Sequence, residues 1–337
     1  MELILANHGS YPRIGDDADG QLLRRAIAQR EKSEKTDADV RAAEDRMTQL
    51  ALGDQLEAGL EVVTDGQIRW YDPVSHLAGK LDGVTITGLL RFFDTNTYFR
   101  QPAVHDAIRR TKSLVVDEYL FARQKSSRPV KAVLTGPYTL AQLSIEAASR
   151  TNGGSGSGSA EGFARRFEGY TAALAEEVAA LAQAGATMIQ VDEPSILKHA
   201  DDFPRFEQAV AALAARKGSA EFTLAVYFGD AAPLYDKLER LPVDVLGLDF
   251  TYSPSLVDRV AAGSAKKLAL GLVDGRNTKL EDASVVAKEL ERIARASGLR
   301  QAYLTPSCGL EYLPRDRAQS KLRRLSTIKR TFSGSPA

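Results

Sequence analysis

Residues 186–196 read ATMIQVDEPSI, and this stretch shows the pattern from which the fold can be predicted. A short apolar run ends in the acidic pair Asp192 and Glu193, and a segment with helical spacing follows after Pro194. This alternation is typical of parallel strands that are joined by helices. Eight such apolar runs occur along the chain, at residues 3–7, 60–64, 131–135, 188–191, 222–227, 245–248, 268–272 and 302–304. Eight strand-plus-helix units predict the α/β class and a single (β/α)8 TIM barrel that spans residues 1–337.

Amphipathic segments lie between the apolar runs, at residues 37–58, 163–184, 285–296 and 317–329. Their apolar residues recur at helical spacing, which predicts helices that cover the outside of the strands. A doubly wound open sheet is the structural alternative, because it also alternates strands with helices.

The composition is that of an ordinary globular protein. Lys and Arg together number 44, and so do Asp and Glu, so no surplus of positive charge is present to attract nucleic acid or an anionic membrane surface. No apolar stretch approaches the roughly 18 residues of a membrane span. The single cysteine cannot form an internal disulfide, and the first apolar run is too short for a signal peptide. We therefore expect a cytoplasmic protein with a small-molecule substrate.

Two segments interrupt the repeat of strands and helices. Residues 67–101 are too many for a simple loop and contain the alternating stretches VTITG and TNTYFR, which predict a hairpin that covers the barrel mouth as a lid. Residues 151–162 read TNGGSGSGSAEG, which is the composition of a flexible loop, whether a natural insertion or an engineered replacement.

Polar residues follow the apolar runs, at the positions where a barrel of this kind holds its active site. They include His8 and Ser10. Because the carboxyl ends of all strands open on one mouth, we expect six of these residues to line one pocket: Asp65, Gln67, Asp192, Asp249, Asp274 and Cys308. A carboxylate behind a buried strand needs a hydrogen-bond donor or a cationic ligand to offset its desolvation. For Asp192, the ammonium group of an amino-acid substrate would serve, and a helix N-cap ahead of Pro194 is the alternative.

Cys308 lies in TPSCGLEYLP, between the last apolar run and the final helical segment. Backbone N–H groups and the helix dipole would lower the pKa of its thiol and suit it to be a metal ligand or a nucleophile, whereas an inert buried cysteine is the alternative. The four histidines form no local zinc motif. Neither GxGxxG nor GxxxxGK[ST] is present, so nicotinamide and ATP chemistry are disfavoured.

Seven motifs occur in order at successive strand ends: GSYPR, TDGQ, TGPYTLA, QVDEPSI, VDVLGLDF, GLVDGRNTKLED and TPSCGLEYLPRDRAQSKLRRL. Together they resemble the catalytic barrel of the cobalamin-independent methionine synthase family along nearly the whole chain, and in particular its short, single-barrel members. The resemblance implies a methyltransferase of one-carbon metabolism, in which a zinc-bound homocysteine thiolate attacks a methyl donor. That donor is a folate or, in some short members, a methylcorrinoid held by a corrinoid protein.

The resemblance also implies which residues would hold zinc, namely a His-x-Cys pair, a Glu and a final Cys. The final Cys matches Cys308, and the Glu falls on Asp249. The His-x-Cys pair falls on Ala225 and Tyr227, neither of which binds zinc in the usual way. The zinc site is therefore expected to be degenerate. Either His8 completes a three-ligand site with Asp249 and Cys308, or zinc is lost.

The implied substrate site departs from the family at one position. The glutamate that helps to hold the amino-acid substrate falls on Gln67, whose neutral amide would bind an ammonium group less well, whereas Ser10 and Asp192 match the other amino-acid-binding positions. In the emptied metal position, the phenol of Tyr227 would donate a hydrogen bond or act as an acid, or it would only fill space.

We therefore expect methyl or alkyl transfer to a thiol or another small polar acceptor. A zinc-independent lyase, or a noncatalytic barrel that binds an amino acid or a corrinoid protein, is the alternative. The side chains expected to carry the chemistry are Tyr227, Asp249 and Cys308, and those expected to bind substrate are Ser10, Asp65, Gln67, Asp192 and Asp274.

Overall fold

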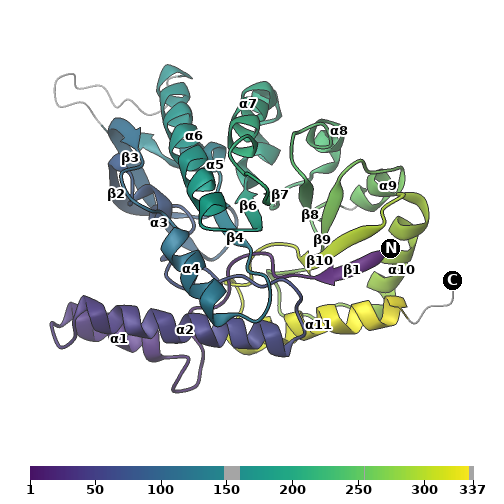
Figure 1. Cartoon of the computed structure of the whole chain (residues 1–337), viewed down its shortest axis with the longest axis horizontal. Helices are drawn as coiled ribbons and strands as arrows, with labels where there is room; N and C mark the ends of the chain where they lie inside the picture. Colours follow the sequence, from purple (N-terminus) through teal and green to yellow (C-terminus); the bar gives the residue numbers. More distant parts are fainter. Residues whose placement is uncertain (148–159, 254, 334–337) are drawn as a thin grey trace. The chain divides into compact units, whose positions relative to one another are not determined.

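The computed structural model describes residues 1–147, 160–253 and 255–333 (Figure 1). The chain divides into two compact units. The first unit comprises Met1–Arg69, Phe121–Lys131 and Leu248–Ala337, and the second unit comprises Trp70–Leu120 and Ala132–Gly247.

In the first unit, the first and last strands of the chain lie side by side. Strand β1 (Glu2–Leu5) pairs in parallel with β10 (Gln301–Pro306), and β10 pairs in parallel with β9 (Lys267–Val273). Strand β8 (Val245–Asp249) ends beside β9, where the amide of Phe250 donates to the carbonyl of Gly271 at 3.2 Å. Direct pairing of the first strand with the last is the strand order of a (β/α)8 barrel, and it argues against the doubly wound alternative.

The predicted strand at residues 60–64 is reduced to two isolated bridges, Ala6 with Val62 and Val63 with Val130. The cause of this irregularity lies at the first residues of the segment. The amides of Glu61 and Val62 both donate to the carbonyl of Leu5, at 2.8 and 3.1 Å. Two successive donors on one acceptor interrupt the regular hydrogen-bond ladder of a parallel strand. The segment therefore occupies the strand position beside β1 without strand regularity.

The second unit holds three more parallel strands, β4 (Ala132–Thr135), β6 (Met188–Asp192) and β7 (Glu221–Val226). Strand β4 pairs with β6, and β6 pairs with β7. Every residue of β4 and β6 is buried, as expected of parallel strands that are covered on both faces. Strand β8 begins in this unit, so seven of the eight predicted runs form strands close to the predicted bounds.

The four predicted amphipathic segments are confirmed as helices α2 (Asp37–Glu57), α6 (Ala160–Gln183), α10 (Ala283–Ala296) and α11 (Arg315–Ser333). Helix α2 begins at a capping box in which Thr36 and Asp39 satisfy each other's backbone amides. Helix α6 buries one apolar face, formed by Phe167, Tyr170, Leu174, Val178 and Leu181. No helix in the described part of the chain is both long enough and apolar enough to cross a bilayer.

The other helical elements are shorter and connect the strands within the fold. They are α1 (Leu22–Glu31), α3 (Ser75–Ala78), α4 (Val116–Lys125), α5 (Pro137–Leu143), α7 (Phe203–Ala214), α8 (Tyr235–Leu238) and α9 (Leu256–Ala261), with the 3-10 turns η1 (Pro194–Lys198), η2 (Ala200–Asp202) and η3 (Ala232–Leu234).

The excursion predicted at residues 67–101 contains a two-stranded hairpin. Strands β2 (Asp82–Arg91) and β3 (Tyr98–Arg109) pair antiparallel, and β5 (Ile145–Glu146) adds in parallel to β3. The hairpin thus extends beyond residue 101 to Arg109, because β3 continues as a strand that packs against α6. Of the Gly/Ser-rich segment, residues 151–159 lie outside the described residues, and Ala160 begins α6.

Candidate functional site

Loops from four strand ends meet around Cys308 in the first unit. A Cβ on Gly309 would collide with the hydroxyl of Ser10, and a Cβ on Gly275 would lie 2.9 Å from Cys308 Sγ. Both positions therefore need glycine, because the chain approaches too closely for a side chain. Asp249 lies close enough to affect the ionisation of the Cys308 thiol. The structure thus brings the loops of Ser10, Asp249, Asp274 and Cys308 together.

The Cys308 thiol is fully buried, and its environment keeps it protonated. Burial raises the pKa of Cys308 well above its ordinary value, the charge of Asp249 raises it further, and Arg276 opposes the shift only weakly. Of the two alternatives for Cys308, the inert buried cysteine is therefore favoured over a thiol with a lowered pKa. The final helix, α11, begins only at Arg315, so the acidic neighbours and the burial outweigh any helix dipole.

Asp249 and Asp274 are each held by a neighbour that the sequence analysis missed. Oδ1 of Asp249 accepts hydrogen bonds from the amide and the hydroxyl of Thr251, at 2.9 and 2.6 Å. Oδ1 of Asp274 accepts from the amide of Arg276 at 2.7 Å, and Oδ2 accepts from the side-chain amide of Asn277. An acid followed two or three residues later by a donor is the signature of a local side-chain turn, and it is readable in the sequence.

Asp65 and Gln67 form a tight turn beside the segment that carries Ser10. The amide of Gln67 donates to Asp65 Oδ1 at 3.0 Å, and the amide of Tyr11 donates to the carbonyl of Gly66 at 2.8 Å. Gln67 is buried and has a φ of 53°, which is costly for a residue other than glycine. The fold therefore holds Gln67 in a buried, strained backbone conformation just after the segment of residues 60–64. His8 is likewise buried, on the segment that follows β1.

In the second unit, the structure brings Asp192 and Tyr227 together. Gln190 Nε2 donates to Asp192 Oδ1 at 2.7 Å, and the hydroxyl of Tyr227 lies 3.4 Å from Asp192 Oδ2, which is long for such a bond. Gln190 was missed, although the two-residue period of a strand places it on the same face as Asp192. Glu193, rather than Asp192, occupies the N-cap of η1, so the capping alternative is wrong.

Glu193 anchors the loop that follows β4. Its carboxylate accepts from the amides of Tyr138 and Thr139, both at 2.8 Å, and from the Thr139 hydroxyl at 2.7 Å. Complete burial raises the pKa of Glu193 to about 7, even though these donors favour the ionised form. Gly136 is required here, because a Cβ would collide with the Glu193 carboxylate. These donors meet the expectation that a carboxylate behind a buried strand needs hydrogen-bond donors to offset its desolvation.

The turn of the β2–β3 hairpin reaches the carboxyl end of β7. Phe92 and Phe93 pack against Phe228, with ring centroids 6.2 and 5.5 Å apart, and Phe228 packs against Tyr227 at 4.7 Å. Lys198 lies over the ring of Phe93 at 5.0 Å. These contacts place the hairpin turn beside Tyr227 within the second unit. That the hairpin acts as a lid stays a prediction.

The donor chemistry of these residues does not fit a catalytic zinc ion. Such sites generally need three protein ligands and one open position. Asp249 and Cys308 supply two, and the side chain of Ala225 has no donor atom. Among residues 1–147, 160–253 and 255–333, no group of three or more His, Cys, Asp and Glu side chains is arranged to hold a metal ion. The role of His8 as a further ligand stays a prediction.

Comparison with known proteins places these observations in a family context. The model of the catalytic domain of cobalamin-independent synthase matches residues 3–330. A methionine synthase from Sulfurisphaera tokodaii is 30% identical over 331 residues, which are 96% of this chain and 90% of the relative. One from Saccharolobus solfataricus is 28% identical over 319 residues, which are 93% of this chain and 90% of the relative.

Two solved structures are similar over their whole length. A B12-independent methionine synthase from Shewanella sp. W3-18-1, in complex with selenomethionine, has a TM-score of 0.76 at 20% identity, over 98% of this chain and 97% of that one. A putative vitamin-B12 independent methionine synthase from Listeria monocytogenes has a TM-score of 0.74 at 17% identity, over 99% of this chain and 100% of that one. At these identities the likeness concerns the fold, and it agrees with the (β/α)8 barrel.

Proposed function

This chain belongs to the cobalamin-independent methionine synthase family, and on that premise we propose that it is a methyltransferase whose acceptor is a thiol or another small polar molecule. The observation that carries the proposal is the family match over residues 3–330. The relatives' name favours methyl transfer over a lyase or a noncatalytic barrel.

We propose further that the acceptor is activated without zinc. In methyl transfer to a thiol, the sulfur–carbon bond forms while the bond from carbon to the donor atom breaks, and that bonding electron pair stays on the donor. The thiol proton must then reach the donor atom. Tyr227 stands where the family has a metal-binding cysteine, and its phenol can give a proton to the donor atom and take one from the thiol.

Asp192 is the proposed partner for a positive group of the acceptor. Its carboxylate is buried, it is held by Gln190 at 2.7 Å, and it lies at the end of β6. A buried carboxylate of this kind favours an ammonium ligand, which would offset its desolvation. Gln67 adds no second negative charge, so we expect weaker selection for an amino acid than two acids would provide. Ser10, Asp65 and Asp274 are the remaining proposed substrate contacts.

The experiment is a methyl-transfer assay with purified protein, isotope-labelled donors and a panel of small thiols that includes homocysteine. Methyltetrahydrofolate and methylcobalamin are tested separately as donors, and the S-methyl product is identified by mass spectrometry. The expected result is a labelled product that Tyr227→Phe suppresses, whereas Tyr71→Phe, an exposed position of the same unit, leaves it unchanged. Absence of labelled product with every pair, or release of sulfide from the thiol, would overturn the proposal and favour the lyase.

A further inference from the structure

Large apolar side chains are exposed together on the β2–β3 hairpin of the second unit. Leu89 and Leu90 of β2 are exposed at 62% and 44%, and Tyr98, the first residue of β3, is exposed at 56%. Scattered exposed apolar residues are ordinary in soluble proteins, whereas several on one element mark a surface that contacts a partner. The hairpin is therefore a candidate contact surface of this unit.

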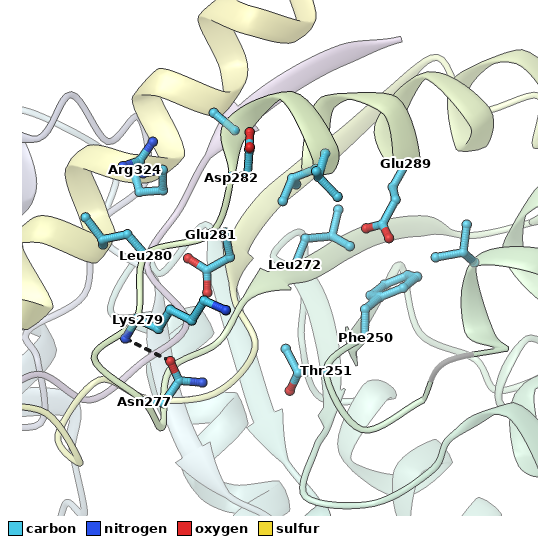
Figure 2. A pocket seen from close by; sticks show the side chains of 14 residues that line it. Phe250, Thr251, Leu272, Asn277, Lys279, Leu280, Glu281, Asp282, Glu289 and Arg324 are labelled. Atoms are coloured by element: carbon cyan, nitrogen blue, oxygen red, sulfur yellow. Dashed lines mark hydrogen bonds between the residues drawn. The ribbon is translucent and has the colours of Figure 1, made fainter.

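The exposed leucine of the first unit, Leu280, has different surroundings. It lines a pocket of about 940 Å³, and Figure 2 shows it among the charged side chains of Lys279, Glu281 and Arg324. Charges of both signs interrupt the apolar surface there. Leu280 therefore serves as a reference for an exposed leucine outside the hairpin.

One edge of β2 has no backbone partner in the part of the chain that the structure describes. The strand order of this sheet is β2-β3-β5, so β2 pairs with β3 alone and its other edge is open. The N–H and C=O groups along such an edge can pair with a further strand. Proteins usually protect long edge strands with proline or charged residues. Residues 83–90 of β2 read GVTITGLL, which contains neither.

The middle of this edge is open to another backbone. The pairing of β2 with β3 shifts register between Ile86 and Leu89, which marks a bulge. Gly88 lies in this bulge, and a Cβ built on it would meet no atom within 4 Å. A glycine inside a strand is often the point at which another backbone approaches closely. The bulge bends the edge, and an identical strand carries the same bend.

The two charged residues of β2 have opposite signs and lie at its two ends, at Asp82 and Arg91. Among the described residues neither forms a salt bridge: Asp82 accepts from the Thr111 hydroxyl at 3.1 Å, and Arg91 donates to two backbone carbonyls of the hairpin turn. Arg109 stands opposite Asp82 in the hairpin register, without an ion pair to it there. Antiparallel pairing of two identical strands would bring the unlike ends together, which favours a second copy over an arbitrary strand.

We propose that β2 pairs antiparallel with β2 of a second copy of this chain, about a two-fold axis between Ile86 and Thr87. Asp82 of each copy then lies opposite Arg91 of the second copy, and the two three-stranded sheets become one of six strands. Such an interface uses the same surface on both copies, so it closes as a dimer. The backbone hydrogen bonds and the exposed leucines supply the affinity, and the end charges set the register.

This dimer contact adjoins the proposed active site without depending on it. Phe92 follows β2 directly and packs against Phe228, which in turn contacts Tyr227. Pairing at β2 therefore restrains the hairpin turn that reaches Tyr227. Association at β2 requires no methyl-transfer activity, so a failed methyl-transfer assay leaves it standing.

The test is the molar mass of the full chain in solution, measured by sedimentation velocity over a concentration series. We expect a reversible equilibrium between monomer and dimer. Leu89→Lys should weaken the dimer about tenfold, because two-fold symmetry brings two lysines into the interface. Leu280→Lys is the matched control and should associate as the parent does. Thermal unfolding followed by circular dichroism checks that each variant is folded.

A charge exchange tests the register. Asp82→Arg and Arg91→Asp should each weaken the dimer about tenfold, because each places two pairs of like charges opposite each other. The double exchange should recover most of the parent's affinity. A parent that stays monomeric throughout the series, a dimer that Leu89→Lys leaves unchanged, or a double exchange without recovery overturns the proposal. A monomeric parent that binds a peptide of β-strand sequence would instead assign the edge to a foreign strand.

Discussion

The hydroxyl of Tyr227 lies 3.4 Å from Oδ2 of Asp192, whose other oxygen accepts from Gln190 at 2.7 Å. In the correspondence that we propose with the family, Tyr227 falls on a zinc-ligand position and Asp192 on a substrate-binding position, so this contact would link the two. At 3.4 Å this contact is long for a hydrogen bond from a phenol and is therefore weak.

Tyr227→Phe should lower kcat for methyl transfer about 100-fold, the lower end of the effect of removing a proton-transferring group. Because Asp192 keeps its bond to Gln190, KM for the acceptor should change little. Asp192→Asn should instead raise KM for an acceptor that carries an ammonium group and change kcat little. Steady-state kinetics of the two variants separates these outcomes. Equal kcat in Tyr227→Phe and the parent would assign Tyr227 to packing alone.

Protein purified without added zinc should contain far less than one zinc per chain, measured by plasma mass spectrometry. Asp249 and Cys308 are too few donors to hold the ion, because catalytic zinc sites generally need three protein ligands. The double change Ala225→His and Tyr227→Cys should restore binding. Stoichiometric zinc in the unchanged protein, lost in Cys308→Ser, would contradict the prediction and point to His8 as the completing ligand.

Glu193→Gln should make the free energy of unfolding less dependent on pH. The folded pKa of Glu193 is about 7, against an ordinary value of 4.5. A raised acid pKa gives a contribution that is fully present below pH 4.5 and is lost as pH rises through 7. The difference in unfolding free energy between parent and variant should therefore change across this window, by up to about 3 kcal/mol. Chemical denaturation at several pH values measures it.

The control for that experiment is Glu207→Gln, because Glu207 is exposed on α7 in the same unit. It should leave the pH dependence of the parent unchanged. A parent and a Glu193→Gln variant with parallel stability profiles between pH 4.5 and 7 would show that Glu193 stays ionised in the folded protein.

Glu118→Gln should destabilise the protein at neutral pH by about 3 kcal/mol, as expected when one partner of a buried ion pair is removed. Burial opposes the ionisation of Glu118, but hydrogen bonds from His76 and Lys80 overcome it and lower its pKa to about 2. Because this pKa is depressed, the stabilisation is present above pH 4.5 and is lost as pH falls toward 2. The variant should therefore lose the most unfolding free energy at neutral pH and little in acid.

The only tryptophan of the chain lies beside the cluster of Glu118, His76 and Lys80, so its fluorescence can report on that cluster. The indole N–H of Trp70 donates to Glu118 at 2.8 Å, and the ring stacks on His76 at 4.9 Å. Glu118→Gln should shift the tryptophan emission, and Asp117→Asn, at the exposed neighbouring position, should not. Identical stability and emission in the Glu118 variant and the parent would rule out a structural role for this cluster.

The sequence by itself determined the elements of the fold and the positions of the acids at their ends. The apolar run at residues 188–191 became β6, and the segment at 285–296 became α10 with a start only two residues earlier, at Ala283. Such elements follow from periods of two and 3.6 residues, which are local properties of the chain. The same local rule located Asp249, the last residue of β8, and Cys308, two residues after the end of β10.

Only the tertiary structure decided the properties that arise from residues far apart in the chain. Residues 60–64 lose strand regularity because two of their amides share the carbonyl of Leu5. The pKa of Cys308 is raised because the fold buries the thiol and brings Asp249 to it, whereas the sequence left open both a lowered pKa and an inert buried cysteine. Burial and electrostatic interaction depend on three-dimensional distances. No local pattern encodes these distances, so sequence located the site residues and the tertiary structure set their protonation.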